Sequence, residues 1–154
     1  MSRPALLFVC LGNICRSPMA EGALRAAADK AGIDVFVDSV GTGSWHIGEP
    51  PDPRAQDEMK RHGVSIAGLK GRQINAEDYR RFTHIFALDD DNLEVIRQRA
   101  PSDASAEIML LLDMVEERQG QPVADPYFGG ADGFARTWED VSAAADALVA
   151  KFRR

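Results

Sequence analysis

The six residues 5–10 (ALLFVC) are all apolar, and Gly12 follows closely after them. A strand of this kind is typical of a parallel sheet, because both faces of such a sheet are covered. Three further strands are expected at residues 34–40, 83–89 and 107–113, with segments of helical periodicity between strands. This alternation predicts an α/β fold in which helices cover both faces of the parallel sheet.

Apolar residues at helical spacing predict helices over residues 18–31, 53–62, 92–99 and 138–152. In sheets of this kind, ligands bind beyond the carboxyl ends of the strands, where the strand order reverses. Cys10 ends the first strand, so it lies at that edge if the first strand is central. We therefore expect the functional site to lie around Cys10.

Length and composition limit the class of protein. A chain of 154 residues suits one domain, residues 1–154. The net charge of −6 argues against a nucleic-acid partner or an anionic membrane surface. The longest apolar runs are far shorter than the ~20 residues that span a bilayer, and no signal-peptide cleavage pattern follows the start. We expect a cytoplasmic monomer whose two cysteines are reduced at rest.

The segment after the first strand, LGNICRSP, joins that strand to a predicted helix. Gly12 and Asn13 are residue types that tolerate positive φ, and Pro18 suits a first helical turn. Ser17 is predicted to be the N-cap of the helix. Such a loop directs backbone N–H groups toward one point, which the helix dipole makes attractive to an anion.

Cys10 and Arg16 give this loop a possible chemistry. The Arg16 guanidinium matches two oxygens of a phosphate, and the same surroundings favour the thiolate form of Cys10. A lone cysteine at a strand end is more often a small buried residue. Here the spacing, five residues between Cys10 and Arg16 followed by Ser17, favours a nucleophile beneath a bound phosphate.

The stretch VCLGNICRSPMAE resembles the phosphate loop of the low-molecular-weight protein tyrosine phosphatases. The stretches DSVGTGSWHIGEPPDPRA, GRQI, FALDDDNL and DPYFGG also match that family, in its order and spacing. The resemblance implies a four-stranded parallel sheet of order 2-1-3-4, with the phosphate loop after strand 1. It also implies that Cys10 is the nucleophile of a metal-independent and cofactor-free hydrolysis of phosphotyrosine and of small aryl phosphates.

The resemblance assigns further roles. Arg16 is the phosphate ligand, Asn13 and Ser17 hold the loop, and Asp125 is the general acid. An Asp-Pro pair alone is more often a turn, but Pro126 favours an extended Asp125 that can reach into a cleft. The implied phosphate-binding residues are Leu11, Gly12, Asn13, Ile14, Cys15, Arg16 and Ser17.

The implied substrate-binding residues are Trp45, Tyr127 and Leu11, with the two aromatic rings on either side of the substrate ring. Phe128 stands where many relatives carry a second tyrosine, so phosphorylation at that position is not expected. Expected partners are phosphotyrosine-containing proteins and phosphate or another oxyanion in the loop. The chain's three histidines lack ligand neighbours at metal-binding spacing, so no metal site is predicted.

Some relatives carry a histidine near Leu69 that helps to order the phosphate loop. Its absence here suggests that Arg72 and Asp89 support Asn13 instead. Close relatives that act on phosphoarginine have threonine where this chain has Ile14, and the apolar Ile14 favours phosphotyrosine. For Cys15 two roles stay open: packing of the loop, or formation of a disulfide with oxidised Cys10.

Two other functions are compatible with the loop. A non-catalytic phosphate-binding module would need neither Cys10 nor Asp125. An arsenate reductase shares the loop and fold, but it relays a disulfide through downstream cysteines, and this chain has none after Cys15. The sequence therefore favours the phosphatase.

Overall fold

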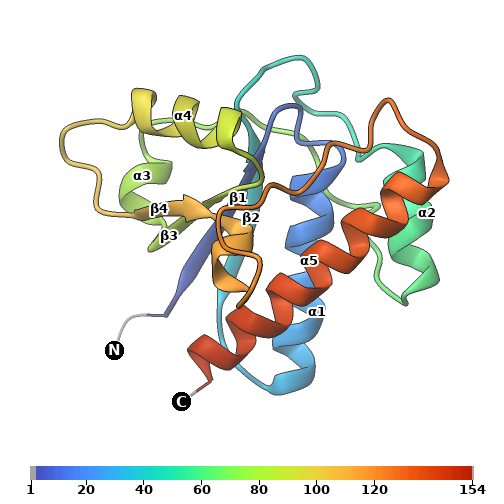
Figure 1. The fold of residues 1–154 in the computed structure, drawn as a ribbon. Coiled ribbons are helices and arrows are strands. Elements are labelled where there is room, and N and C mark those ends of the chain that lie inside the picture. Colours follow the sequence, from blue (N-terminus) through green and yellow to red (C-terminus); the bar gives the residue numbers. More distant parts are fainter. Residues whose placement is uncertain (1–2, 154) are drawn as a thin grey trace.

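The computed structural model describes residues 3–153 and contains one parallel four-stranded sheet (Figure 1). Strand β1 (Ala5–Cys10) is central and pairs with β2 (Phe36–Gly41) and with β3 (His84–Ala87). Strand β4 (Glu107–Leu110) pairs with β3 at the edge. The order β2-β1-β3-β4 confirms the predicted fold, and Cys10 lies at the carboxyl end of a central strand.

Strand β1 is buried at every position because helices cover both faces of the sheet. One face packs against three helices: α1 (Arg16–Ala31), α2 (Pro53–Arg61) and α5 (Ala131–Phe152). The other face packs against α3 (Asp78–Arg81) and α4 (Asp90–Arg99). No helix within residues 3–153 is both long and apolar enough to cross a membrane.

The ends of several elements differ from the prediction. Helix α1 begins at Arg16, with Cys15 as a cap that makes no side-chain hydrogen bond, so the prediction of Ser17 as N-cap was wrong. Strand β4 ends at Leu110, where the chain turns into a 3₁₀ helix, η1 (Leu111–Met114). Helix α5 starts at Ala131, earlier than expected.

The loop after β1 is held against the segment that follows β2. Gly41 makes this approach possible, since a Cβ there would lie 2.9 Å from the carbonyl oxygen of Leu11. The carbonyl oxygens of Cys10 and Leu11 accept hydrogen bonds from the backbone N–H groups of Thr42 and Gly43, both at 2.9 Å. The pairing of β1 with β2 thus continues into the loop and fixes its position.

Candidate active site

A cavity of about 180 Å³ opens at the carboxyl end of β1. It brings together side chains from the loop after β1, the segment after β2 and the segment before α5. The lining residues are Cys10, Leu11, Gly12, Ile14, Cys15, Arg16, Trp45, His46, Asp125, Tyr127 and Phe128. The two other residues predicted at the site, Asn13 and Ser17, are buried and do not line the cavity.

The backbone of the loop is polarised. Its carbonyl groups at Cys10 and Leu11 are paired with the neighbouring segment. Within residues 3–153, by contrast, the N–H groups of residues 11–17 donate to no other protein group. Buried backbone donors need a partner, and N–H groups at a helix N-terminus suit an anion. The loop therefore has the arrangement of an oxyanion-binding site.

Asn13 has a φ of 57°, as predicted, and its Oδ1 accepts a hydrogen bond of 3.0 Å from the backbone N–H of Arg72. The same expectation was wrong for Gly12, which is not in the positive-φ region. Gly12 instead leaves room for His46, whose Cδ2 would lie 3.2 Å from a Cβ at this position. Small size rather than backbone freedom explains the glycine.

Arg16 is 3% exposed and is oriented by three groups. Its Nη1 donates to Asp89 Oδ2 at 2.6 Å and to the carbonyl oxygen of Val123 at 2.9 Å. Its Nη2 lies 3.7 Å from Asp125 Oδ2. Burial opposes the charge of the guanidinium, but Cys10, Asp89 and Asp125 outweigh burial and raise the pKa of Arg16. Asp89 thus supports Arg16; the expected contact with Asn13 is made by Arg72 alone.

Asp125 comes from the segment before α5, and its side chain is 41% exposed at the cavity wall. Its Oδ1 accepts from the backbone N–H of Tyr127 at 3.1 Å, which leaves Oδ2 toward Arg16. The exposed rings of Trp45 and Tyr127 form the rim. Phe128 is 92% exposed and meets the Tyr127 ring edge-on, with 4.9 Å between ring centroids.

Both cysteines are free thiols that line the same cavity. Cys10 Sγ lies 3.0 Å from Ser17 Oγ, within hydrogen-bonding distance. Burial raises the pKa of Cys15 far above its ordinary range, and nearby Asp52 and Cys10 add to this effect. Cys15 is therefore protonated at neutral pH.

His46 and Phe128 line the cavity although no sequence pattern predicted them there, and Ser39 on β2, also not predicted, accepts a hydrogen bond of 3.0 Å from Asn13. Trp45 and Tyr127, which were predicted to bind the substrate, are the sequence neighbours of His46 and Phe128 and could have indicated them. Nothing in the local pattern around Ser39 distinguishes it from other strand residues.

A cysteine and an arginine in one anion-binding loop, with a carboxylic acid above them, are typical of enzymes that hydrolyse phosphoric monoesters. The family model of the low molecular weight phosphotyrosine protein phosphatases matches residues 5–154. The chain belongs to this family, and it is a low molecular weight protein-tyrosine phosphatase.

Relatives from distant organisms support this family assignment. The low molecular weight phosphotyrosine protein phosphatase of Schizosaccharomyces pombe is 43% identical over 84% of each chain. The low molecular weight protein-tyrosine-phosphatase YfkJ of Bacillus subtilis is 38% identical over 97% of this chain and 96% of its own. The crystal structure of DARP, a drosophila arginine phosphatase, superposes with a TM-score of 0.91 at 33% identity, covering 97% of this chain and 98% of that chain.

We predict that Asp89→Asn lowers kcat/KM about 10-fold to 100-fold, because Arg16 loses its shortest charge-assisted hydrogen bond. Asparagine can still accept from the backbone N–H of Asn92, so the cap of α4 is retained. Steady-state kinetics on a phosphotyrosine peptide measure the loss. Asp103→Asn, at an exposed ion pair with Arg80, is the control and should match the wild type. Equal kinetics for both variants would contradict the role of Asp89.

Proposed function

We propose that this enzyme hydrolyses phosphotyrosine in two steps through a cysteinyl-phosphate. In the first step the Cys10 thiolate attacks phosphorus, and the bond from phosphorus to the ring oxygen breaks as the S–P bond forms. Protonated Asp125 gives its proton to the departing oxygen. Arg16 and the N–H groups of residues 11–17 bind the other phosphate oxygens and stabilise the charge on them.

In the second step a water molecule attacks phosphorus, and ionised Asp125 accepts a proton from that water. The S–P bond breaks, Cys10 leaves as a thiolate, and inorganic phosphate is released. One carboxyl group thus acts first as the acid and then as the base. The mechanism uses no metal or organic cofactor, because the permanently charged Arg16 supplies the positive charge.

The observation that carries this proposal is the meeting of Cys10, Arg16 and Asp125 in one cavity, from segments far apart in the chain. A module that only binds phosphate gains nothing from Asp125. Beside Arg16, an ionised Asp125 would repel the phosphate dianion. Asp125 is useful there only if it carries a proton that it can transfer.

The rim of the cavity favours an aryl phosphate. An aromatic ring between Trp45 and Tyr127 gains about 0.5–1.5 kcal/mol for each well-placed pair, beyond the burial of its area. Cys10 is only 3% exposed, so the phosphate must descend below the rim. We therefore expect the shorter phosphoserine side chain to bring its phosphorus less close to Cys10. Small aryl phosphates such as p-nitrophenyl phosphate fit the same slot, and phosphotyrosine-containing proteins are the expected macromolecular partners.

A leaving-group series tests the mechanism. We predict that Asp125→Asn slows aryl phosphates with poor leaving groups on the order of 10²-fold to 10⁴-fold, and activated ones far less, because only the former need the proton. The wild type should be fully active with a chelator present. Cys10→Ser should be inactive yet still bind phosphate. Equal slowing across the series, or turnover by Cys10→Ser, would refute the assigned roles.

Ile14 is proposed to select phosphotyrosine over phosphoarginine. Its apolar side chain lines the cavity and suits a phenyl ring, whereas a threonine hydroxyl there can bond a guanidinium. We predict a higher kcat/KM for phosphotyrosine than for phosphoarginine and phosphoserine peptides, and a shift of that ratio toward phosphoarginine in Ile14→Thr. The control Ile47→Thr changes an exposed isoleucine that does not line the cavity. Better turnover of phosphoarginine by the wild type would show that Ile14 does not discriminate.

We further propose that Cys15 protects Cys10 from irreversible oxidation. Peroxide converts the Cys10 thiolate to a sulfenic acid, and the Cys15 thiol then displaces water from it to form a disulfide. Mild peroxide should therefore inactivate the enzyme reversibly, and mass spectrometry of the unreduced peptide should show the Cys10–Cys15 bond. If only sulfinic or sulfonic Cys10 forms and a thiol restores no activity, Cys15 is a packing residue.

A further inference from the structure

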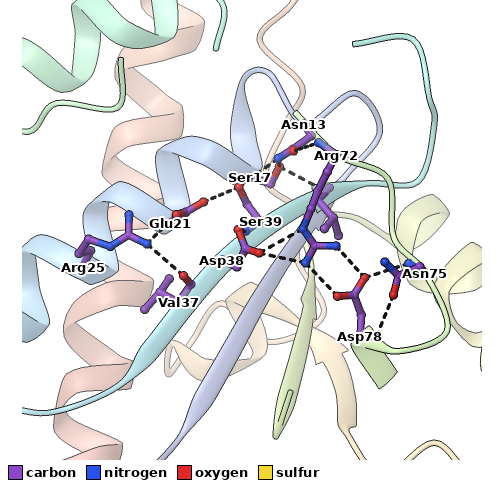
Figure 2. A network of polar contacts seen from close by, with 11 residues as sticks. Asn13, Ser17, Glu21, Arg25, Val37, Asp38, Ser39, Arg72, Asn75 and Asp78 are labelled. Carbon is purple, nitrogen blue, oxygen red and sulfur yellow. Dashed lines mark hydrogen bonds and ion pairs between the residues drawn. The ribbon is translucent and has the colours of Figure 1, made fainter. Parts of the chain in front are cut away.

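A chain of side-chain hydrogen bonds runs beneath the loop from Glu21 on α1 through Ser39 on β2 and Asn13 to Ser17 (Figure 2). Ser39 Oγ donates to Glu21 Oε1 at 2.6 Å. Asn13 Nδ2 donates to Ser39 Oγ at 3.0 Å and to Ser17 Oγ at 2.8 Å. Ser17 Oγ lies 3.0 Å from Cys10 Sγ. These hydrogen bonds therefore connect the buried carboxylate of Glu21 to Cys10, the proposed nucleophile.

The chemistry of these groups fixes the direction of each bond. An ionised Glu21 can only accept, so the single hydroxyl hydrogen of Ser39 points to Glu21. The oxygen of Ser39 then faces Asn13 as an acceptor. Asn13 is oriented independently, because its Oδ1 accepts from the backbone N–H of Arg72. Both hydrogens of its amide nitrogen are therefore used, one on Ser39 and the other on Ser17.

The hydroxyl hydrogen of Ser17 is the last one whose acceptor has to be assigned. Ser17 Oγ accepts from Asn13, so its own hydrogen is available either to Cys10 Sγ at 3.0 Å or to the carbonyl oxygen of Val40 at 3.4 Å. The second distance is long for a hydroxyl donor, and a thiolate only accepts. The Ser17 hydroxyl therefore donates to the thiolate of Cys10.

We propose that Glu21 is a positioning residue. Its carboxylate accepts the hydroxyl hydrogen of Ser39, so that Asn13 keeps the orientation favoured by Arg72, in which Ser17 donates its hydrogen to the Cys10 thiolate. This inference rests on the proposed role of Cys10 as nucleophile. Glu21 contacts neither the cavity nor any substrate position, and it acts through Ser39 and Asn13.

The surroundings of Glu21 support this role. Its side chain, like those of Ser39, Asn13 and Ser17, is at least 95% buried, so bulk water is a poor substitute for any member of the chain. Burial raises the pKa of Glu21, and nearby Asp38 adds to the rise, while the hydrogen bonds from Ser39 and Arg25 oppose it only in part. The Arg25 guanidinium lies 2.7 Å from Oε2 and also binds the carbonyl oxygen of Val37, which favours the ionised carboxylate.

The substitution Glu21→Gln tests the direction of these hydrogen bonds without changing the size of the side chain. Arg25 only donates, so it draws the oxygen of the new amide and leaves the NH₂ group facing Ser39. Ser39 then accepts from the glutamine, and its hydrogen needs a new acceptor. Asn13 can supply one only by turning its oxygen away from Arg72. That turn also draws the Ser17 hydrogen from Cys10.

The readout is the pH dependence of Cys10 carboxymethylation by iodoacetate, followed at Cys10 by tandem mass spectrometry. We expect the midpoint of this dependence to rise by about 1 pH unit in Glu21→Gln, because the thiolate loses a hydrogen bond. The value of kcat should fall about 10-fold with little change in KM. Glu58→Gln is the matched control, since Glu58 is another buried carboxylate, paired with Arg61 on α2 and with His62, the C-cap of that helix.

The control should lower the free energy of unfolding without moving the midpoint. Ser39→Ala removes the hydroxyl whose hydrogen would turn Asn13, and it keeps the Glu21–Arg25 pair, while Arg72 still orients Asn13. Its midpoint should therefore stay at the wild-type value, and the double variant should return to that value, because Glu21→Gln acts only through the Ser39 hydrogen. A wild-type midpoint in Glu21→Gln, an equal rise in Glu58→Gln, or a raised midpoint in Ser39→Ala or in the double variant would overturn the inference.

These outcomes separate the two proposals. A wild-type midpoint in Glu21→Gln would refute the role of Glu21 but leave the catalytic role of Cys10 standing. Turnover by Cys10→Ser would refute that role, whatever the midpoint of the thiol in the other variants.

Discussion

The structure depends on the backbone pairing between the loop after β1 and the segment after β2. Two hydrogen bonds, from Thr42 and Gly43 to the carbonyl oxygens of Cys10 and Leu11, continue the sheet past its last ladder residue. They occupy loop carbonyls and leave the loop N–H groups directed elsewhere. The same segment can approach only because Gly41 has no side chain. One extension of strand pairing thus produces the positive, anion-binding character of the site.

The site also depends on Arg16. The positive charge of this buried side chain is stable only because negatively charged groups lie close to it. Asp89 provides the close partner from the end of β3, and Asp125 stands further away on an exposed segment. This difference suits their different tasks. A short, buried contact holds the guanidinium still, whereas the longer contact from a half-exposed segment is compatible with the proton transfer proposed for Asp125.

Apolar periodicity was sufficient for the strands of the sheet and for α1, α2, α4 and α5, but it missed the short helix α3. The sequence was insufficient where a tertiary contact overrides a local preference. Ser17 has the right chemistry for an N-cap, but its hydroxyl is turned under the loop toward Asn13 and Cys10. The spacing of Cys10 and Arg16 revealed the loop itself. The partners of Arg16 and Asn13 lie far away in the chain, so no local pattern could assign them.

The reactive loop lies near the start of the chain, whereas the groups that position it come much later. Arg72 holds Asn13, and Val123 and Asp125 surround Arg16. During translation the N-terminal part emerges first, so a nascent chain carries Cys10, the proposed nucleophile, long before the groups that orient the loop. We expect a fragment that ends before Val123 to contain the complete motif but to lack activity, because Arg16 then has neither Val123 nor Asp125 beside it. The appearance of enzymatic activity is therefore a late event in the biogenesis of this protein and reports that its tertiary structure is complete.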